Sequence, residues 1–145
     1  YDEARVLLPG TKPVVADVDD FKIGLSVCYD LRFPELYRAM GKVDLIVMPA
    51  AFTYTTGRAH WEVLMRARAI ENQCYVVAVN RVGTDGKNIV YAGDSVACDM
   101  WGEPLTDIKP YKGSVVTVSL DAKPLQSSRQ SFPVGLDADA FSLRG

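Results

Sequence analysis

Residues 24–35 read Gly-Leu-Ser-Val-Cys-Tyr-Asp-Leu-Arg-Phe-Pro-Glu, a pattern in which a strand turns sharply into a helix. The apolar run of residues 21–27 ends at Cys28, and polar and turn-forming residues follow at once. Pro34 stands where the first turn of a helix tolerates proline, and the helix is expected to continue until Gly41. The pattern therefore predicts a buried strand that ends on Cys28.

Further strands and helices are predicted on both sides of this stretch. Four apolar runs read as strands: residues 14–18, 21–27, 44–49 and 75–79. The first two flank the turn Asp19-Asp20 and predict a hairpin, whereas the last two are typical of strands buried on both faces of an α/β sheet. Residues 53–57 read as a polar loop, and residues 58–72 have apolar side chains near helical spacing.

The C-terminal third predicts shorter strands. Asp85-Gly86 is a strong hairpin signal, residues 89–100 supply one or two strands, and residues 114–120 read as the last strand. The tail from Gln126 has no clear periodicity. The order of elements predicts an α/β fold with a mixed β-sheet and stacked helices.

Composition restricts the possible functions. The 145 residues are 48% hydrophobic and 23% charged, which is typical of a single globular domain. A net charge of −2 predicts no nucleic-acid partner, and the longest apolar run, residues 45–52, is too short to span a membrane. Three cysteines without a CxxC pair and a single histidine make a poor metal set. An odd cysteine count without a leader favours a reducing compartment, the cytoplasm.

Cys28 is the cysteine best placed for chemistry. Cys74 and Cys98 lie in apolar runs, where cysteine acts as a small hydrophobic residue. A nucleophile at a strand end is held by the strand and exposed by the turn, and free N–H groups at the helix start favour a thiolate. The backbone N–H of Tyr29 is then a candidate oxyanion donor. The alternative is a buried strand-end cysteine without a reaction.

Residues 24–35 resemble the nucleophile segment of the nitrilase superfamily, the carbon–nitrogen hydrolases. The resemblance continues through the chain in residues 44–50, 60–73, 80–83, 93–95 and 101–103. It covers essentially all of residues 1–145 and implies that they are the C-terminal part of a four-layer αββα sandwich. Within the superfamily it is strongest to the ω-amidase branch.

The resemblance also implies a mechanism and its partners. In this family a cysteine, a glutamate base and a lysine act together, so Cys28 would attack an amide carbon, release ammonia and leave a thioester that water hydrolyses. The substrate would be the amide of a small carboxylic or 2-oxo acid, no metal or organic cofactor is needed, and a homodimer or higher homo-oligomer is expected. Deaminated glutathione amidase is the closest rival activity.

One departure from the family pattern concerns the catalytic set. The family's base glutamate and lysine precede the cysteine, but only 27 residues precede Cys28, and Lys12 and Lys22 read as solvated surface lysines. We therefore expect an incomplete catalytic set, no activity of these residues alone, and an uncovered apolar surface. Glu3 resembles a second glutamate that helps to position substrate, although an exposed terminal glutamate is the alternative reading. A non-catalytic fragment or binding module is the rival from another class.

The substrate pocket is expected where the strand after Cys28 ends. Phe52 and Thr53 stand there, and Arg32 or Arg58 is a candidate partner for a substrate carboxylate. A Cys28–His60 dyad of the thiol-protease type is the disfavoured alternative, because the resemblance gives His60 no catalytic role.

Overall fold

The computed structural model describes residues 3–107 and 111–139, apart from the side chain of Glu3. Its main sheet has the strand order β1-β2-β3-β4-β7. These strands are β1 (Val14–Val18), β2 (Phe21–Leu25), β3 (Leu45–Ala50), β4 (Tyr75–Asn80) and β7 (Val96–Cys98). The three central strands run parallel, and β1 and β7 pair with them antiparallel. The predicted hairpin and the mixed α/β sheet are confirmed.

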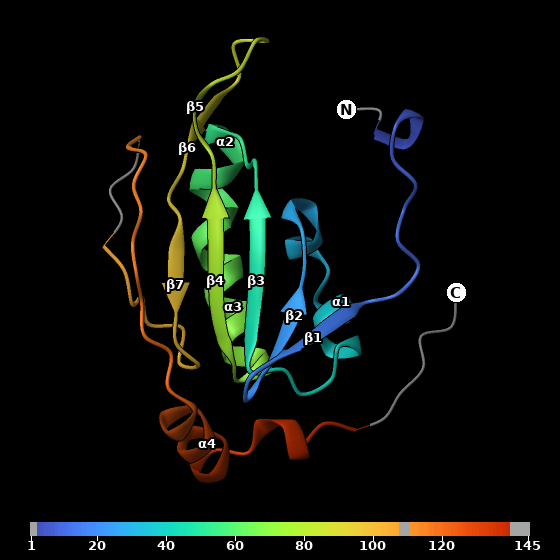
Figure 1. The fold of residues 1–145 in the computed structure, drawn as a ribbon, viewed down its shortest axis with the longest axis vertical. Helices are drawn as coiled ribbons and strands as arrows, with labels where there is room; N and C mark the ends of the chain where they lie inside the picture. Colours follow the sequence, from blue (N-terminus) through green and yellow to red (C-terminus); the bar gives the residue numbers. More distant parts are fainter. Residues whose placement is uncertain (1–2, 108–110, 140–145) are drawn as a thin grey trace.

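The remaining elements connect these strands. The helical ones are η1 (Glu3–Arg5), η2 (Cys28–Arg32), α1 (Pro34–Ala39), α2 (Tyr54–Thr56), η3 (Gly57–Trp61), α3 (Glu62–Asn72), α4 (Ala122–Ser131) and η4 (Val134–Leu136). A separate hairpin, β5 (Val82–Thr84) and β6 (Val90–Ala92), turns at the predicted Asp85-Gly86. Figure 1 shows α1 and α3 behind the sheet, with α4 at its lower end.

The main core lies between α3 and the sheet. Trp61, Met65 and Ala69, spaced one turn apart, are fully buried there. They face side chains of one sheet face, namely Ile46, Met48, Val76 and Ala78. The prediction that β3 and β4 are buried on both faces holds only at their lower ends, because Leu45 and Tyr75 on the other face are buried whereas Val79 is exposed.

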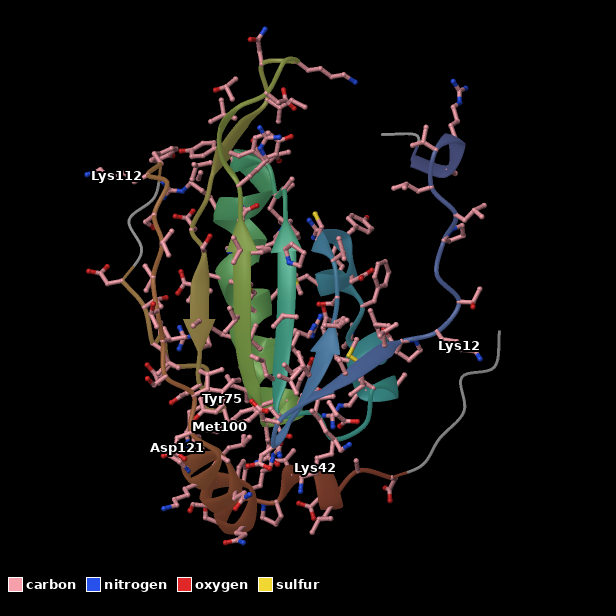
Figure 2. All side chains as sticks on the ribbon, in the orientation of Figure 1. Lys12, Lys42, Tyr75, Met100, Lys112 and Asp121 are labelled. Carbon is pink, nitrogen blue, oxygen red and sulfur yellow. The ribbon has the colours of Figure 1, made fainter. Side chains whose placement is uncertain are left out.

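The opposite face of the sheet is covered only in part. At its lower end Leu45, Tyr75, Met100 and Leu125 form a second buried cluster under α4 (Figure 2). Higher up, apolar side chains of this face are open: Val14, Leu25 and Val79 are 53%, 42% and 59% exposed. Cross-strand pairing joins Val14 to Leu25 and continues through Val47 and Val77. The main sheet therefore has a helical layer on one face, whereas its other face is covered by α4 at the lower end and is open above it.

Two expectations about local structure are wrong, and one helix has no counterpart among the predicted elements. Residues 114–120 form no strand, although Figure 1 shows their segment running beside β7, and Val115 is 98% exposed. The tail instead contains α4, whose N-cap Asp121 accepts a hydrogen bond from Lys123 N–H at 2.8 Å. Residues 53–57 are not a plain loop, because α2 and η3 already begin the helical segment there.

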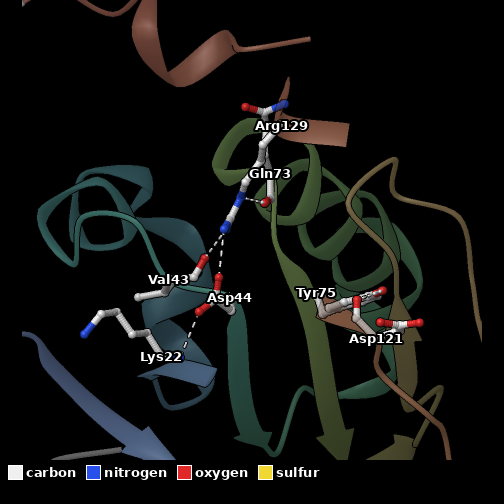
Figure 3. A network of polar contacts seen from close by, with 7 residues as sticks. All are labelled: Lys22, Val43, Asp44, Gln73, Tyr75, Asp121 and Arg129. Atoms are coloured by element: carbon white, nitrogen blue, oxygen red, sulfur yellow. Dashed lines mark hydrogen bonds and ion pairs between the residues drawn. The ribbon is translucent and has the colours of Figure 1, made fainter. Parts of the chain in front are cut away.

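Arg129 attaches α4 to the lower end of the sheet (Figure 3). Its guanidinium binds the Asp44 carboxylate at 2.7 Å and donates to the backbone oxygens of Gln73, at 2.8 Å, and Val43. Asp44 also accepts the backbone N–H of Lys22 at 2.9 Å. The Arg129 and Asp44 side chains are only 10% and 21% exposed, so neither charge has much access to water.

Replacing Arg129 by methionine should lower the free energy of unfolding by about 3 kcal/mol, because it leaves the Asp44 carboxylate buried without its cation. Urea unfolding of the natural protein measures this. Gln130→Met, an exposed change on the same helix, should stay within about 0.5 kcal/mol of the parent protein. An equally small effect of Arg129→Met would contradict the structural role of the ion pair.

Candidate active site

Three parallel strands end at one edge of the sheet and bring the predicted site residues together. Cys28 follows β2, Phe52 and Thr53 follow β3, and Arg81 follows β4. In Figure 1 all three arrows point upward; β3 and β4 end side by side below α2, and β2 ends lower. Ligands of open α/β sheets bind at this kind of edge. Cys28, Arg32 and Phe52, although distant in sequence, therefore share one region of the fold.

Cys28 occupies an unusual backbone conformation. Its φ is +49°, a region that residues other than glycine enter rarely and at a cost of about 1–3 kcal/mol. Asp30 holds the turn, because its carboxylate accepts the Val27 N–H at 2.8 Å while its own N–H donates to Val27 O at 3.0 Å. The Cys28 side chain is half-buried and packs against the main core. The turn thus presents a partly exposed thiol at the end of the strand.

The expectation that the strand ends on Cys28 and turns directly into a helix is wrong, because β2 already ends at Leu25 and a separate turn follows. η2 is a five-residue 3-10 turn, and α1 with Pro34 in its first turn follows separately. A long helix whose dipole would act on the thiol is therefore absent at this position in the described chain. Tyr29 directly follows Cys28 in η2, which keeps its backbone N–H beside the thiol-bearing residue.

Arg32 lies among groups from η2, η3 and the segment after β3. Its guanidinium carbon is 5.2 Å from the ring centre of Phe52 and 5.3 Å from that of Tyr29. Its Nη1 lies 3.2 Å from Nδ1 of His60, which is carried by η3. Aromatic faces attract a guanidinium, so these rings hold the half-buried Arg32 near the edge where the three parallel strands end. The hydrogen-bonding partner of His60 is Arg32, which gives the Cys28–His60 dyad no support.

Phe52 is fixed by a residue that sequence reasoning did not assign to the site. The Asn80 side chain accepts the Phe52 N–H at 2.8 Å and donates to Phe52 O at 3.3 Å. Ser95 in turn bonds both backbone groups of Asn80 through its hydroxyl. The Phe52 ring is 5% exposed and contacts Trp61, with centroids 4.9 Å apart. The only sequence signal was the polar residue at the end of β4.

The segment after Phe52 is helical from the start. The hydroxyls of Thr53 and Thr56 lie 3.0 Å apart, and Gly57 N–H donates to Thr53 O at 2.7 Å. η3 then makes one π-helical turn, a form that is frequent at functional sites. Arg58 in this turn is exposed, and its guanidinium carbon lies 5.8 Å from the ring centre of Tyr54.

The other predicted residues lie outside this cluster. Lys12 is exposed on the N-terminal segment (Figure 2), and Lys22 pairs with Asp17 at 2.8 Å on the surface, as expected for both lysines. The backbone of Glu3 belongs to η1, which Figure 1 draws apart from the sheet, and its side chain lies outside the described atoms. In the described ranges, no three His, Cys, Asp or Glu residues gather as metal ligands. Nor does any described helix combine the length and hydropathy needed to cross a bilayer.

Comparison with known families agrees with this geometry. The family model described as carbon-nitrogen hydrolase matches residues 1–130. The chain belongs to the carbon–nitrogen hydrolase family. Relatives of this carbon–nitrogen hydrolase include the deaminated glutathione amidase of Dictyostelium discoideum, 39% identical, and omega-amidase NIT2 of Homo sapiens, 38% identical. Each alignment covers 92% of this chain but only 46% and 49% of the relative, so the chain spans about half their length.

Solved structures of carbon–nitrogen hydrolases share the fold. A superfamily protein from Xanthomonas campestris superposes with a TM-score of 0.90 at 38% identity, over 99% of this chain and 56% of that one. Nit3 of Saccharomyces cerevisiae, from branch 10 of the nitrilase superfamily, gives a TM-score of 0.83 at 30% identity. That alignment covers 91% of this chain and 49% of Nit3. The predicted superfamily is thus confirmed.

The three thiols of this carbon–nitrogen hydrolase should react very differently with iodoacetamide. Burial raises the pKa of Cys74 to about 12 and that of Cys98 to about 11, and both side chains are fully buried. A raised thiol pKa keeps the neutral, unreactive form, so raising the pH from 7 to 9 should not label either residue. Cys28 alone should be labelled in the native protein, and all three in urea, as peptide mass spectrometry would measure. Native labelling of Cys74 at pH 7 would contradict this arrangement.

Proposed function

We propose that this chain carries the nucleophile of an amidase that acts on a small carboxylic or 2-oxo acid amide. The Cys28 sulfur attacks the amide carbon, the nitrogen takes a proton and leaves as ammonia, and water hydrolyses the resulting thioester. The observation that supports this most directly is the strained turn that presents Cys28 where three parallel strands end. Strain of this kind persists where the surrounding structure maintains it for function.

The neighbouring residues have proposed roles that fit their places. The Tyr29 N–H stabilises the oxyanion, because it is the first donor after the nucleophile. Arg32 pairs with the carboxylate of the substrate, since its charge is held at the same edge. Phe52 and Thr53 line the pocket at the end of β3. The Phe52 backbone is held by Asn80, and its ring packs against the Arg32 guanidinium. Glu3 positions substrate from the N-terminal segment.

The preferred substrate class is the side-chain amide of 2-oxo acids such as 2-oxoglutaramate. Relatives named omega-amidase support this choice, and relatives named deaminated glutathione amidase, at similar identity, support the alternative. Both are amides of 2-oxo acids, so a cation such as Arg32 suits either. The two differ in size, which makes a direct comparison of rates decisive.

The catalytic set is proposed to be completed by groups outside this chain. The chain would be the C-terminal portion of the family's domain, with a base glutamate and a lysine supplied upstream. The half-length coverage of its relatives and the open apolar face of the sheet both support this proposal. We further propose a cytoplasmic homo-oligomer. In its support, Trp101 and Phe132 are 53% and 56% exposed and stack with centroids 6.1 Å apart, as at an interface.

The full-length natural protein should release ammonia from 2-oxoglutaramate faster than from deaminated glutathione, and Cys28→Ser should abolish both activities. Serine keeps the shape of the side chain but is a far weaker nucleophile. Ammonia release is measured by a coupled assay, with Ser26→Ala on the preceding strand end as the matched control. Activity that survives in Cys28→Ser would exclude the nucleophile role, and a faster reaction with deaminated glutathione would favour the alternative substrate.

Residues 1–145 purified alone should show no amidase turnover. Removing members of a catalytic set that acts as a unit costs orders of magnitude in rate. The same assay at equal concentration of the full-length protein provides the comparison. Robust ammonia release by the isolated residues would show that the set is complete within them.

A further inference from the structure

Arg68 is a charged residue of α3 that is almost completely buried. Its side chain is 5% exposed, and buried arginines are rare unless they are paired. Nη1 binds the Glu71 carboxylate at 2.6 Å, and the guanidinium carbon lies 5.4 Å from the ring centre of Tyr37 in α1. These contacts hold the guanidinium in one orientation, with its other nitrogens directed at the segment that carries Cys28.

Both remaining donor groups bind a single backbone oxygen. Nε and Nη2 donate to the carbonyl of Leu31 at 3.1 and 2.7 Å. Leu31 is buried in η2, three residues after Cys28, and the last carbonyls of such a turn lack partners within it. The Arg68 fork therefore satisfies this carbonyl and connects the nucleophile turn to the longest helix.

The turn needs such support because Cys28 has a positive φ. Asp30 closes its beginning through the Val27 N–H, as described above, but this contact lies within the turn itself. The fork of Arg68 acts from another element and fixes where the turn lies relative to the sheet. A strained residue keeps its conformation only when its surroundings determine it from several sides.

We propose that Arg68 is a positioning residue for the nucleophile, acting through the Leu31 carbonyl to set the place of the Cys28 thiol and the Tyr29 N–H. The proposal rests on the proposed function of Cys28. Lysine cannot replace the fork, because a single ammonium does not supply two coplanar N–H groups to one oxygen. Small displacements of a reacting group cost up to about a hundredfold in rate, which sets the size of the effect.

The test uses Arg68→Lys in the full-length natural protein, with Arg66→Lys as the matched control. Arg66 lies on the same helix and also donates through Nε to a backbone oxygen, that of Gly102 at 2.7 Å, away from η2. For Arg68→Lys we expect kcat to fall about ten- to hundredfold with KM nearly unchanged, and the rate of Cys28 alkylation to fall at least severalfold. Arg66→Lys should leave both rates within twofold.

Several outcomes would overturn the proposal. If Arg68→Lys lowers only the melting temperature, while kcat per titrated thiol and the alkylation rate stay at the parent level, Arg68 is merely structural. If Arg68→Lys does not fold, Glu71→Gln, which loosens the same guanidinium and keeps an acceptor, must slow Cys28 alkylation, and an unchanged rate refutes the positioning role. Alkylation requires no substrate, so these results remain separate from a failure of the proposed amidase activity.

Discussion

The parallel pairing of β2, β3 and β4 is the constraint on which the site depends. Gly24 pairs with Ile46, and Ile46 pairs with Val76, so the three strands keep one register across the sheet. Parallel strands end at the same edge, and segments separated by about 25 residues in sequence therefore meet there. A slip of one residue would move Ile46 and Met48 from the covered face to the open one, which burial strongly disfavours.

The turn at Cys28 is held in place by the packing of the elements around it. A Cβ on Gly24 would lie 2.7 Å from the sulfur of Met40 at the end of α1, so a larger residue there would require the Met40 side chain to move. Close packing of α1 keeps Tyr37 buried beneath Arg68, whose guanidinium holds the carbonyl of Leu31. The backbone of Cys28 is thus held between a strand and two helices. These packing contacts offset the free-energy cost of its positive φ.

The hydrophobic pattern of the sequence predicted the buried strands of the sheet correctly. The apolar runs of β3 and β4 are too continuous for a surface strand, and the expected hairpin and mixed sheet followed from their order. The strand prediction for residues 114–120 failed because β-propensity describes a fit to a half-buried surface and does not supply a partner strand. Most of this segment is exposed, and only Val118 and Leu120 are half-buried. α4 was missed although Asp121 is a good N-cap and Pro124 lies in the first turn.

The candidate site was predictable only where a single stretch of sequence contains the whole pattern, as around Cys28. Cys28 closely follows a strand, and Pro34 comes soon after it, so the turn could be predicted from this segment alone. The hydrogen bonds between Asn80 and Phe52, in contrast, join residues 28 positions apart. No local pattern encodes which polar residue will reach a given backbone amide. The same holds for Arg68. Its sequence position suggests an ordinary surface charge of a helix, and only the fold brings it to the Leu31 carbonyl in η2.

The open apolar face of the sheet bears on the proposed function. Val14, Leu25 and Val79 present apolar surface to solvent beside the edge where Cys28 lies, and Val6, Leu7 and Leu8 are exposed on the segment that leads to β1. Covering such surface is the largest favourable term available to the fold. Under the proposed function, segments outside this chain supply a base and a lysine. If the same segments cover this face, burial of apolar area would drive assembly of the proposed catalytic set. Stability and activity would then be gained in the same step, and loss of either should accompany loss of the other.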